Sequence, residues 1–80
     1  MNLQTAIRYR LLSLCGERSI SIQQLALLSG ISKSTVKNIF YKATANPTIR
    51  TIKILCDGLE ITLDEFFSSP EFKSLEQEIK

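Results

Sequence analysis

Two lysines placed four residues apart, Lys33 and Lys37, are followed directly by an asparagine, Asn38. In an α-helix, residues four apart share one face, so both ammonium groups would point in the same direction. Lysine can donate to guanine O6 and N7, and an asparagine amide can pair bidentately with adenine N6 and N7. The three side chains therefore have the chemistry to contact base edges, provided that a helix presents them. The alternative is an ordinary solvated helix face.

The segment around these residues, Ser21–Ile39 (SIQQLALLSGISKSTVKNI), predicts two short helices joined by a tight turn. Ser21 caps the first helix, and Gln24 three residues later completes a capping box. Gly30 supplies the turn, where glycine adopts a left-handed backbone at the lowest cost. Ser32 caps the second helix, whose free N–H groups could receive a phosphate. This pattern is typical of a helix-turn-helix, whose second helix enters the major groove of DNA.

Helices joined by so short a turn must cross closely, and the sequence meets the requirements of that crossing. Ala26 is a small side chain at the crossing point. Apolar anchors stand behind it, at Leu25, Ile31, Val36 and Ile39. Each feature is common alone, but their combination with basic groups on the exposed face favours DNA contact.

The remaining turn signals divide the chain into five helices and a short sixth one. Asn2 caps a first helix that is expected to stop near Gly16, and Thr48, after Pro47, caps a fourth helix that Gly58 ends. The side chains expected to face inward are Leu3, Ile7, Leu11 and Leu14 in the first helix, Leu25 and Leu28 in the second, Val36, Ile39 and Phe40 in the third, and Ile49, Ile52, Leu55 and Cys56 in the fourth.

The last part of the chain continues the helical pattern. Thr62 and Glu65 form a capping box for a fifth helix, and Ser69-Pro70 begins a last one. These helices carry Leu63, Phe66 and Phe67, then Phe72, Leu75 and Ile79. No segment alternates polar and apolar residues, so we predict a compact all-α fold. Its expected parts are a DNA-binding domain at 1–69, with the helix-turn-helix at 21–41, and a C-terminal helix at 70–80.

Charge is distributed unevenly along the chain. Residues 1–56 hold eight basic side chains against one acid, a net charge of +7, whereas residues 57–80 hold seven acids against two lysines, a net charge of −5. A polyanion would be attracted to the first part and repelled by the second. Scattered solvated charge is the alternative, but the asymmetry favours a protein that approaches nucleic acid with one end.

Composition excludes several other classes of protein. No apolar run approaches the ~20 residues that cross a bilayer, and no secretion signal is evident, so we expect a cytoplasmic protein without a membrane partner. The chain lacks histidine, and Cys15 and Cys56 are far apart, which predicts no metal site, no cofactor and two reduced core thiols, with a buried disulfide as the alternative. No nucleophile with a base, paired carboxylate or phosphate loop suggests an enzyme or a small-molecule ligand.

From about Arg10 to Phe67 the chain resembles the Cro and lambda-type phage repressor family, the XRE-type helix-turn-helix regulators. The resemblance lies in LALLSGISKSTVKNI, in the Asn46-Pro47-Thr48 connection and in CDGLEITLDEFF. It implies the five-helix lambda-repressor-like fold and sequence-specific binding of double-stranded DNA. The base-reading positions of the family fall on Lys33, Ser34, Lys37 and Asn38. Its phosphate-contacting positions fall on Ser32, Thr35, Lys42, Thr44 and Asn46.

Two positions depart from the family pattern. Ile22 stands where a phosphate-contacting glutamine is frequent, and Phe40 stands where an acid often pairs with an arginine of the first helix. We therefore expect Arg10 to be free for phosphate or solvent. Arg8, Arg50 and Lys53 are further candidates for phosphate contacts, although solvated surface charge is the alternative for each.

The C-terminal apolar residues suggest self-association. We expect a homodimer through some of Phe66, Phe67, Phe72, Leu75 and Ile79, since such regulators usually pair on two half-sites. The alternative is that the last helix folds onto the first and closes the core. Together, these sequence features predict a transcriptional repressor. The alternative is a protein-binding, antitoxin-like role, which the acidic and aromatic segment 60–80 favours.

Overall fold

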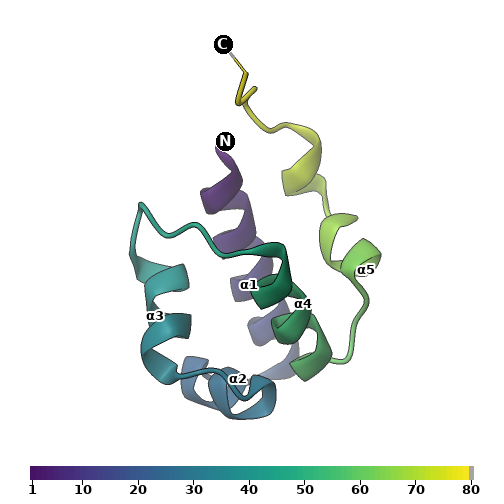
Figure 1. The fold of residues 1–80 in the computed structure, drawn as a ribbon. Coiled ribbons are helices and arrows are strands. Elements are labelled where there is room, and N and C mark those ends of the chain that lie inside the picture. The colour runs from purple at the N-terminus through teal and green to yellow at the C-terminus, as the bar shows by residue number, and fades with distance from the viewer. Residues whose placement is uncertain (80) are drawn as a thin grey trace.

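The computed structural model describes residues 1–79 and confirms the all-α class with five helices (Figure 1). Within those residues there is no strand. The elements are α1 (Leu3–Arg18), α2 (Ile22–Ser29), α3 (Lys33–Tyr41), α4 (Ile49–Gly58), α5 (Leu63–Phe67) and the 3-10 turn η1 (Pro70–Lys73).

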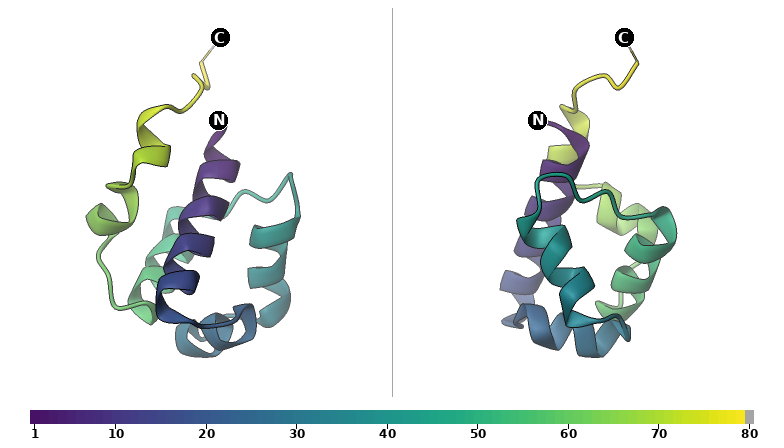
Figure 2. Two further views of the ribbon diagram at one scale, coloured as in Figure 1. Left: turned by 180° about the vertical axis from the view of Figure 1, so that it is seen from behind. Right: turned by 60° about the vertical axis from the view of Figure 1, so that its left-hand side comes forward.

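The helices enclose one core. In all three ribbon views α2 lies across one end of α1, α3 and α4, while α5 lies on the side of the molecule opposite α3 (Figures 1 and 2). The core side chains come from all five helices and from the turn after α4: Ile7, Leu11, Leu14, Cys15, Leu25, Ala26, Val36, Ile39, Phe40, Ile52, Leu55, Cys56, Leu59 and Phe66. The arrangement therefore leaves the outer side of α3 facing solvent.

Both cysteines are free and buried, as the sequence predicts. Burial raises the pKa of the Cys15 and Cys56 thiols above its ordinary value, because the surrounding apolar side chains disfavour the thiolate. Each thiol thus packs as a small neutral apolar group.

The predicted helix starts are confirmed. In the five α-helices, each N-cap side chain accepts a backbone N–H three residues later; for example, the Asn2 Oδ1 accepts from Thr5 N at 2.8 Å. The other capping residues are Ser21, Ser32, Thr48 and Thr62. The capping box of Thr62 and Glu65 is complete in both directions, so local chemistry fixes this short helix.

One of the two glycines expected to end helices lies inside its helix instead. Helix α1 passes Gly16 and ends at Arg18, with Ser19 in the left-handed region (φ 53°), whereas α4 ends at Gly58 as predicted, with Glu60 at φ 60°. Gly58 has another function, because an added Cβ would lie 2.4 Å from the Ser29 Oγ and 3.1 Å from the Ser29 Cα. The absence of a side chain at Gly58 therefore permits the close approach of α4 to α2.

Two residues predicted to be inward are exposed. Leu28 is 58% accessible and Ile49 is 63% accessible. In α2 only Leu25 and Ala26 are buried, so Leu28 lies outside the buried face of the helix. Ile49 is the first residue of α4, and only the later turns of this helix pack against the core.

The predicted C-terminal helix is wrong beyond one turn. Only Pro70–Lys73 is helical, as a 3-10 turn; the Ser69 side chain makes no capping bond, and Ser74 leaves the helical region at φ −119°. Acidic residues such as Glu76 and Glu78 would have stood near the C-terminal end of that helix, where its dipole disfavours negative charge. Lys80, which ends the predicted helix, lies outside the described residues.

Candidate nucleic-acid interface

The α2–α3 pair has the geometry that the sequence predicts. Gly30 adopts φ 69°, and the Ile31 N–H donates to the Ala26 carbonyl at 3.2 Å, which closes the turn. Ala26 is buried at the crossing, so no large side chain separates the helices. The turn is therefore short and fixes the direction of α3.

Helix α3 divides cleanly into two faces. Val36, Ile39 and Phe40 are buried, and the other side carries the polar residues. Ser32 Oγ accepts from the Thr35 N–H at 3.2 Å and lies 2.8 Å from Thr35 Oγ1, so the helix start is held by two short contacts. The apolar half of α3 thus anchors the helix and leaves its polar half uncovered.

The structure brings the four predicted base-reading residues together. Lys33, Ser34, Lys37 and Asn38 are all exposed, and together they line one shallow depression on the outside of α3. None of the ion pairs within residues 1–79 uses Lys33 or Lys37. Both ammonium groups are thus available to an external hydrogen-bond acceptor.

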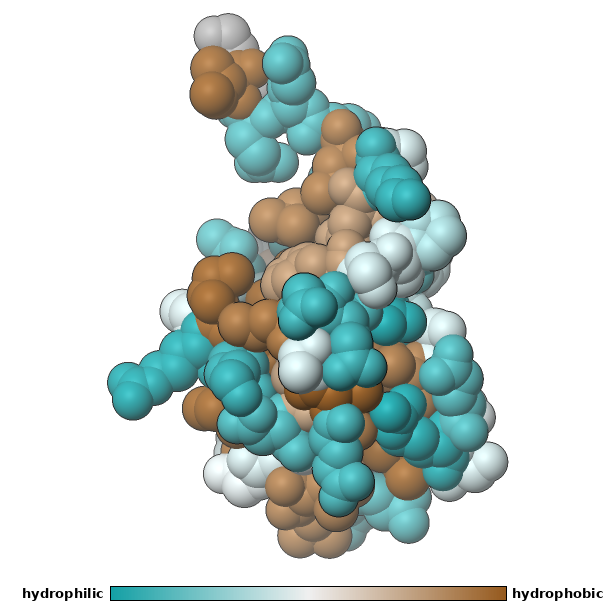
Figure 3. Space-filling view, turned by 90° about the vertical axis from the view of Figure 1, so that its right-hand side faces the viewer, coloured by the Kyte–Doolittle hydropathy of each residue, from teal (hydrophilic) through white to brown (hydrophobic). Residues whose placement is uncertain are grey.

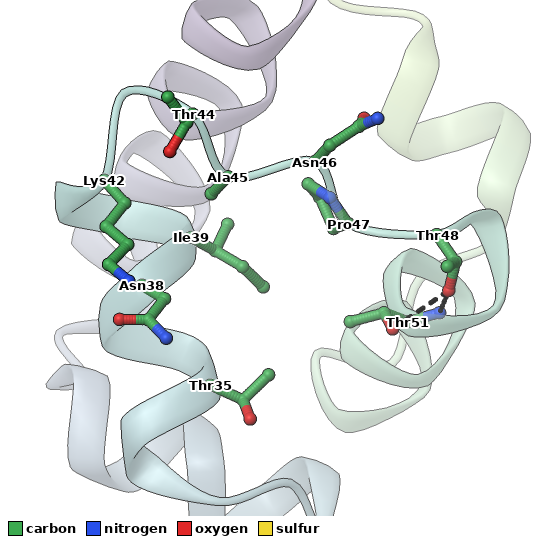
Figure 4. A pocket seen from close by; sticks show the side chains of 10 residues that line it. All are labelled: Thr35, Asn38, Ile39, Lys42, Thr44, Ala45, Asn46, Pro47, Thr48 and Thr51. Carbon is green, nitrogen blue, oxygen red and sulfur yellow. Dashed lines mark hydrogen bonds between the residues drawn. The ribbon is translucent and has the colours of Figure 1, made fainter.

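The predicted phosphate-contacting residues lie beside that face. Ser32 and Thr35 are at the start of α3, and Lys42, Thr44 and Asn46 follow in the loop to α4; all five are exposed. A groove runs between α3, this loop and the start of α4, with the buried Ile39 at its floor (Figure 4). It is lined by Thr35, Asn38, Ile39, Lys42, Thr44, Ala45, Asn46, Pro47, Thr48 and Thr51.

Sequence reasoning did not assign Thr48 and Thr51 to this site. The Thr48 hydroxyl caps α4 by accepting the Thr51 N–H at 3.1 Å, and the two hydroxyls lie 3.1 Å apart. Both side chains line the groove opposite α3 (Figure 4). The capping pattern located Thr48 at a helix start, but only the packing of α4 shows that this start faces α3.

The structure corrects the expectation for Arg10. Its Nε donates to the Phe66 carbonyl at 2.8 Å and its Nη2 donates to the Glu65 carbonyl at 2.8 Å. The guanidinium carbon lies 6.0 Å from the centre of the Phe66 ring. Arg10 is therefore bound to the end of α5 and is not free for phosphate.

The other flanking cations differ from one another. Lys53 forms an ion pair with Asp57 one turn later on α4, whereas Arg50 is exposed near the start of that helix. Arg8 is half-buried, with no partner for its Nε among residues 1–79. Of these cations, Arg50 is the exposed one that lies next to the groove residue Thr51 in sequence.

The five candidates for self-association occupy different environments. Phe66 is completely buried and belongs to the core. Phe67 and Phe72 are half-buried and pack against that core, and their rings lie 4.9 Å apart, nearly perpendicular. Leu75 is half-buried, whereas Ile79 is 86% exposed. η1 packs against α1, so the C-terminal segment partly closes the core, as the alternative reading expected.

No group of metal-binding side chains occurs within residues 1–79. In that same part of the chain, none of the helices combines the length and apolar character needed to cross a bilayer.

The fold and the exposed α3 face define the class of this molecule as a DNA-binding helix-turn-helix protein. The chain belongs to the family HTH_3, described as Helix-turn-helix, whose model matches residues 11–66. It is similar to a solved structure, the crystal structure of the prophage Lp1 protein 11, with a TM-score of 0.80 and 29% identity over 94% of this chain and 100% of that one. No curated protein matches the chain. The chain is a DNA-binding regulator of the XRE type, a family of regulatory domains and not of enzymes.

Proposed function

We propose that this protein is a sequence-specific transcriptional repressor that reads the major groove with α3. The observation that carries the proposal is the uncovered face on which Lys33, Ser34, Lys37 and Asn38 lie together. Bases contacted by these side chains would set specificity, while phosphate contacts would set affinity and register. We propose competition with RNA polymerase for a promoter as its mechanism, and we place the protein in the cytoplasm.

The phosphate contacts in this proposal come from both sides of α3. Ser32 and Thr35 present the helix start to one phosphate, and Lys42, Thr44 and Asn46 present the loop to another. Ile22, the first residue of α2, is half-buried against the core and its side chain offers no donor. The net positive charge of residues 1–56 attracts the duplex, and the acidic α5 and C-terminal segment lie on the side away from α3 (Figure 2).

Replacing Lys33 and Asn38 together by alanine is expected to remove the preference for the operator. The ratio of operator affinity to unrelated-duplex affinity should fall at least about tenfold, because each base contact is worth ~1–3 kcal/mol. Fluorescence polarisation titrations measure the ratio. The matched control is Lys73→Ala with Gln77→Ala, which removes the same charge and amide from the exposed C-terminal segment. An unchanged ratio in the α3 variant would refute base reading by this helix.

The salt dependence of binding separates this function from the antitoxin-like one. A repressor that neutralises several phosphates loses affinity steeply as salt rises, with a slope of about −0.9 for each phosphate. Indifference to DNA at low salt would favour the protein-binding function instead. Less aromatic surface is available for protein binding than the sequence suggested, since Phe66 is buried and Phe67 and Phe72 are half-buried.

We further propose that the protein acts as a homodimer through its C-terminal face. Hydrophobic side chains gather on the face that α5 and the C-terminal segment present, and another stands off the body at the chain end (Figure 3). Phe67, Phe72, Leu75 and Ile79 are the contact candidates, with Phe66 supporting them from the core. A two-fold pair would place two α3 helices in major grooves one helical turn apart, about 34 Å.

The dimer is expected to be lost when Leu75 and Ile79 are both replaced by aspartate, because two buried charges would oppose each other across the contact. Sedimentation equilibrium measures the mass. The control is Leu27→Asp on α2, which is 76% exposed and lies outside the C-terminal face. A dimer that survives the double change, or a wild-type protein that stays monomeric at high concentration, would contradict the proposed contact.

A further inference from the structure

The DNA-facing part of the chain contains no acid. From Arg18 to Cys56 there is no aspartate or glutamate, and this stretch includes α2, α3, the loop and most of α4. A carboxylate is the side chain that accepts a hydrogen bond from cytosine N4. The outer face of α3 offers ammonium, hydroxyl and amide groups in its place, so it is rich in donors and poor in acceptors.

The two lysines dominate that donor set. A lysine ammonium has three donors and no acceptor. Neither Lys33 nor Lys37 takes part in a side-chain hydrogen bond or ion pair given by the structure of residues 1–79. In the major groove, guanine presents two adjacent acceptors, O6 and N7, whereas thymine presents one acceptor beside a methyl group. Guanine is thus the base whose edge best complements each of these lysines.

The spacing of the lysines limits where those guanines can lie. Four residues of α-helix rise about 6 Å, and successive base pairs are about 3.4 Å apart. Bases contacted by Lys33 and Lys37 are therefore about two steps apart if the helix follows the groove. Asn38 follows Lys37 directly and is the amide side chain on this face. An asparagine amide can pair bidentately with adenine.

We infer that α3 selects a guanine-containing half-site. Two guanines lie within three consecutive base pairs, on either strand, and accept hydrogen bonds from Lys33 and Lys37; an adenine beside the Lys37 guanine pairs with Asn38. This inference rests on the proposed function and specifies the ligand of the same face.

The experiment selects bound sites from random duplexes and then edits the guanines of the recovered half-site. Replacing one guanine by 7-deazaguanine removes its N7 acceptor but keeps its base pair, and is expected to weaken wild-type binding about five- to tenfold. Lys33→Ala should abolish the response at one guanine and Lys37→Ala the response at the other. The charge-matched control Lys73→Ala, on η1, should keep both responses.

Two outcomes would overturn the inference while leaving DNA binding intact. The first is a recovered half-site without guanines. The second is a uniform loss of affinity in both lysine variants on every duplex, with the salt slope reduced by about 1, because that behaviour marks a phosphate contact. Failure of the wild-type protein to bind any duplex at low salt would instead refute the proposed function, and the first titration reveals it before base identity is tested.

Discussion

Replacing Phe66 by alanine is expected to lower the free energy of unfolding by about 3–5 kcal/mol, the usual cost of removing a core phenyl ring. Phe66 is completely buried. Its ring meets Phe67 edge-on at 4.9 Å between centroids and lies 5.8 Å from Phe72. One substitution therefore leaves a cavity and removes aromatic contacts that join α5 and η1 to the core. Urea denaturation followed by circular dichroism measures the loss.

The control for this variant is the neighbouring ring. Phe67 contacts the rings of Phe66 and Phe72, but it is half-buried, so Phe67→Ala should cost only about 1–2 kcal/mol. Equal losses for the two variants would show that the cluster is not centred on Phe66. A loss for Phe67→Ala that grows with protein concentration would be expected if the proposed dimer forms on this face.

The sequence predicts those parts of the structure that depend on neighbouring residues. Helix starts follow from hydrogen bonds across three residues, and Ser21 and Thr62 each close a capping box as expected. The two faces of α3 follow from helical periodicity, because buried Val36 and Ile39 determine where Lys33 and Lys37 must point. The candidate recognition face was thus predictable before its surroundings were known.

Features that depend on distant parts of the chain were not predictable. Gly58 ends α4 as predicted, but an added Cβ there would also meet Ser29, which lies in another helix, and no local pattern indicated this close approach. The groove beside α3 needs the placement of α4, so Thr51 carried no signal of its own. Ser19 and Glu60 adopt left-handed conformations that their residue types disfavour, so residue type gave no signal for these two turns.

Arg10 is the clearest example of such a distant contact, and its removal is expected to have the second largest effect. The two carbonyls that it binds, those of Glu65 and Phe66, belong to the last turn of α5, where the regular i+4 donors are missing; the Glu65 carbonyl also accepts from Ser68. They lie 55 and 56 residues away in the sequence, so no local pattern relates them to Arg10. The contact is a clamp that joins α1 to α5.

Arg10→Met keeps an apolar stem of similar length but removes both donors. We expect the free energy of unfolding to fall by about 2–3 kcal/mol, since hydrogen bonds from a charged donor are each worth about 1.5–3 kcal/mol and one of the two is solvent-exposed. Arg10→Lys retains the charge but not the planar fork that reaches both carbonyls, so it should recover only part of the loss. Amide hydrogen exchange should increase in α5 more than in α3. The reason is that Arg10 binds α5 directly, whereas α3 is held by its own buried side chains. Equal stability of all three proteins would contradict the clamp, and increased exchange throughout the chain would show that Arg10 stabilises the whole fold and not α5 in particular.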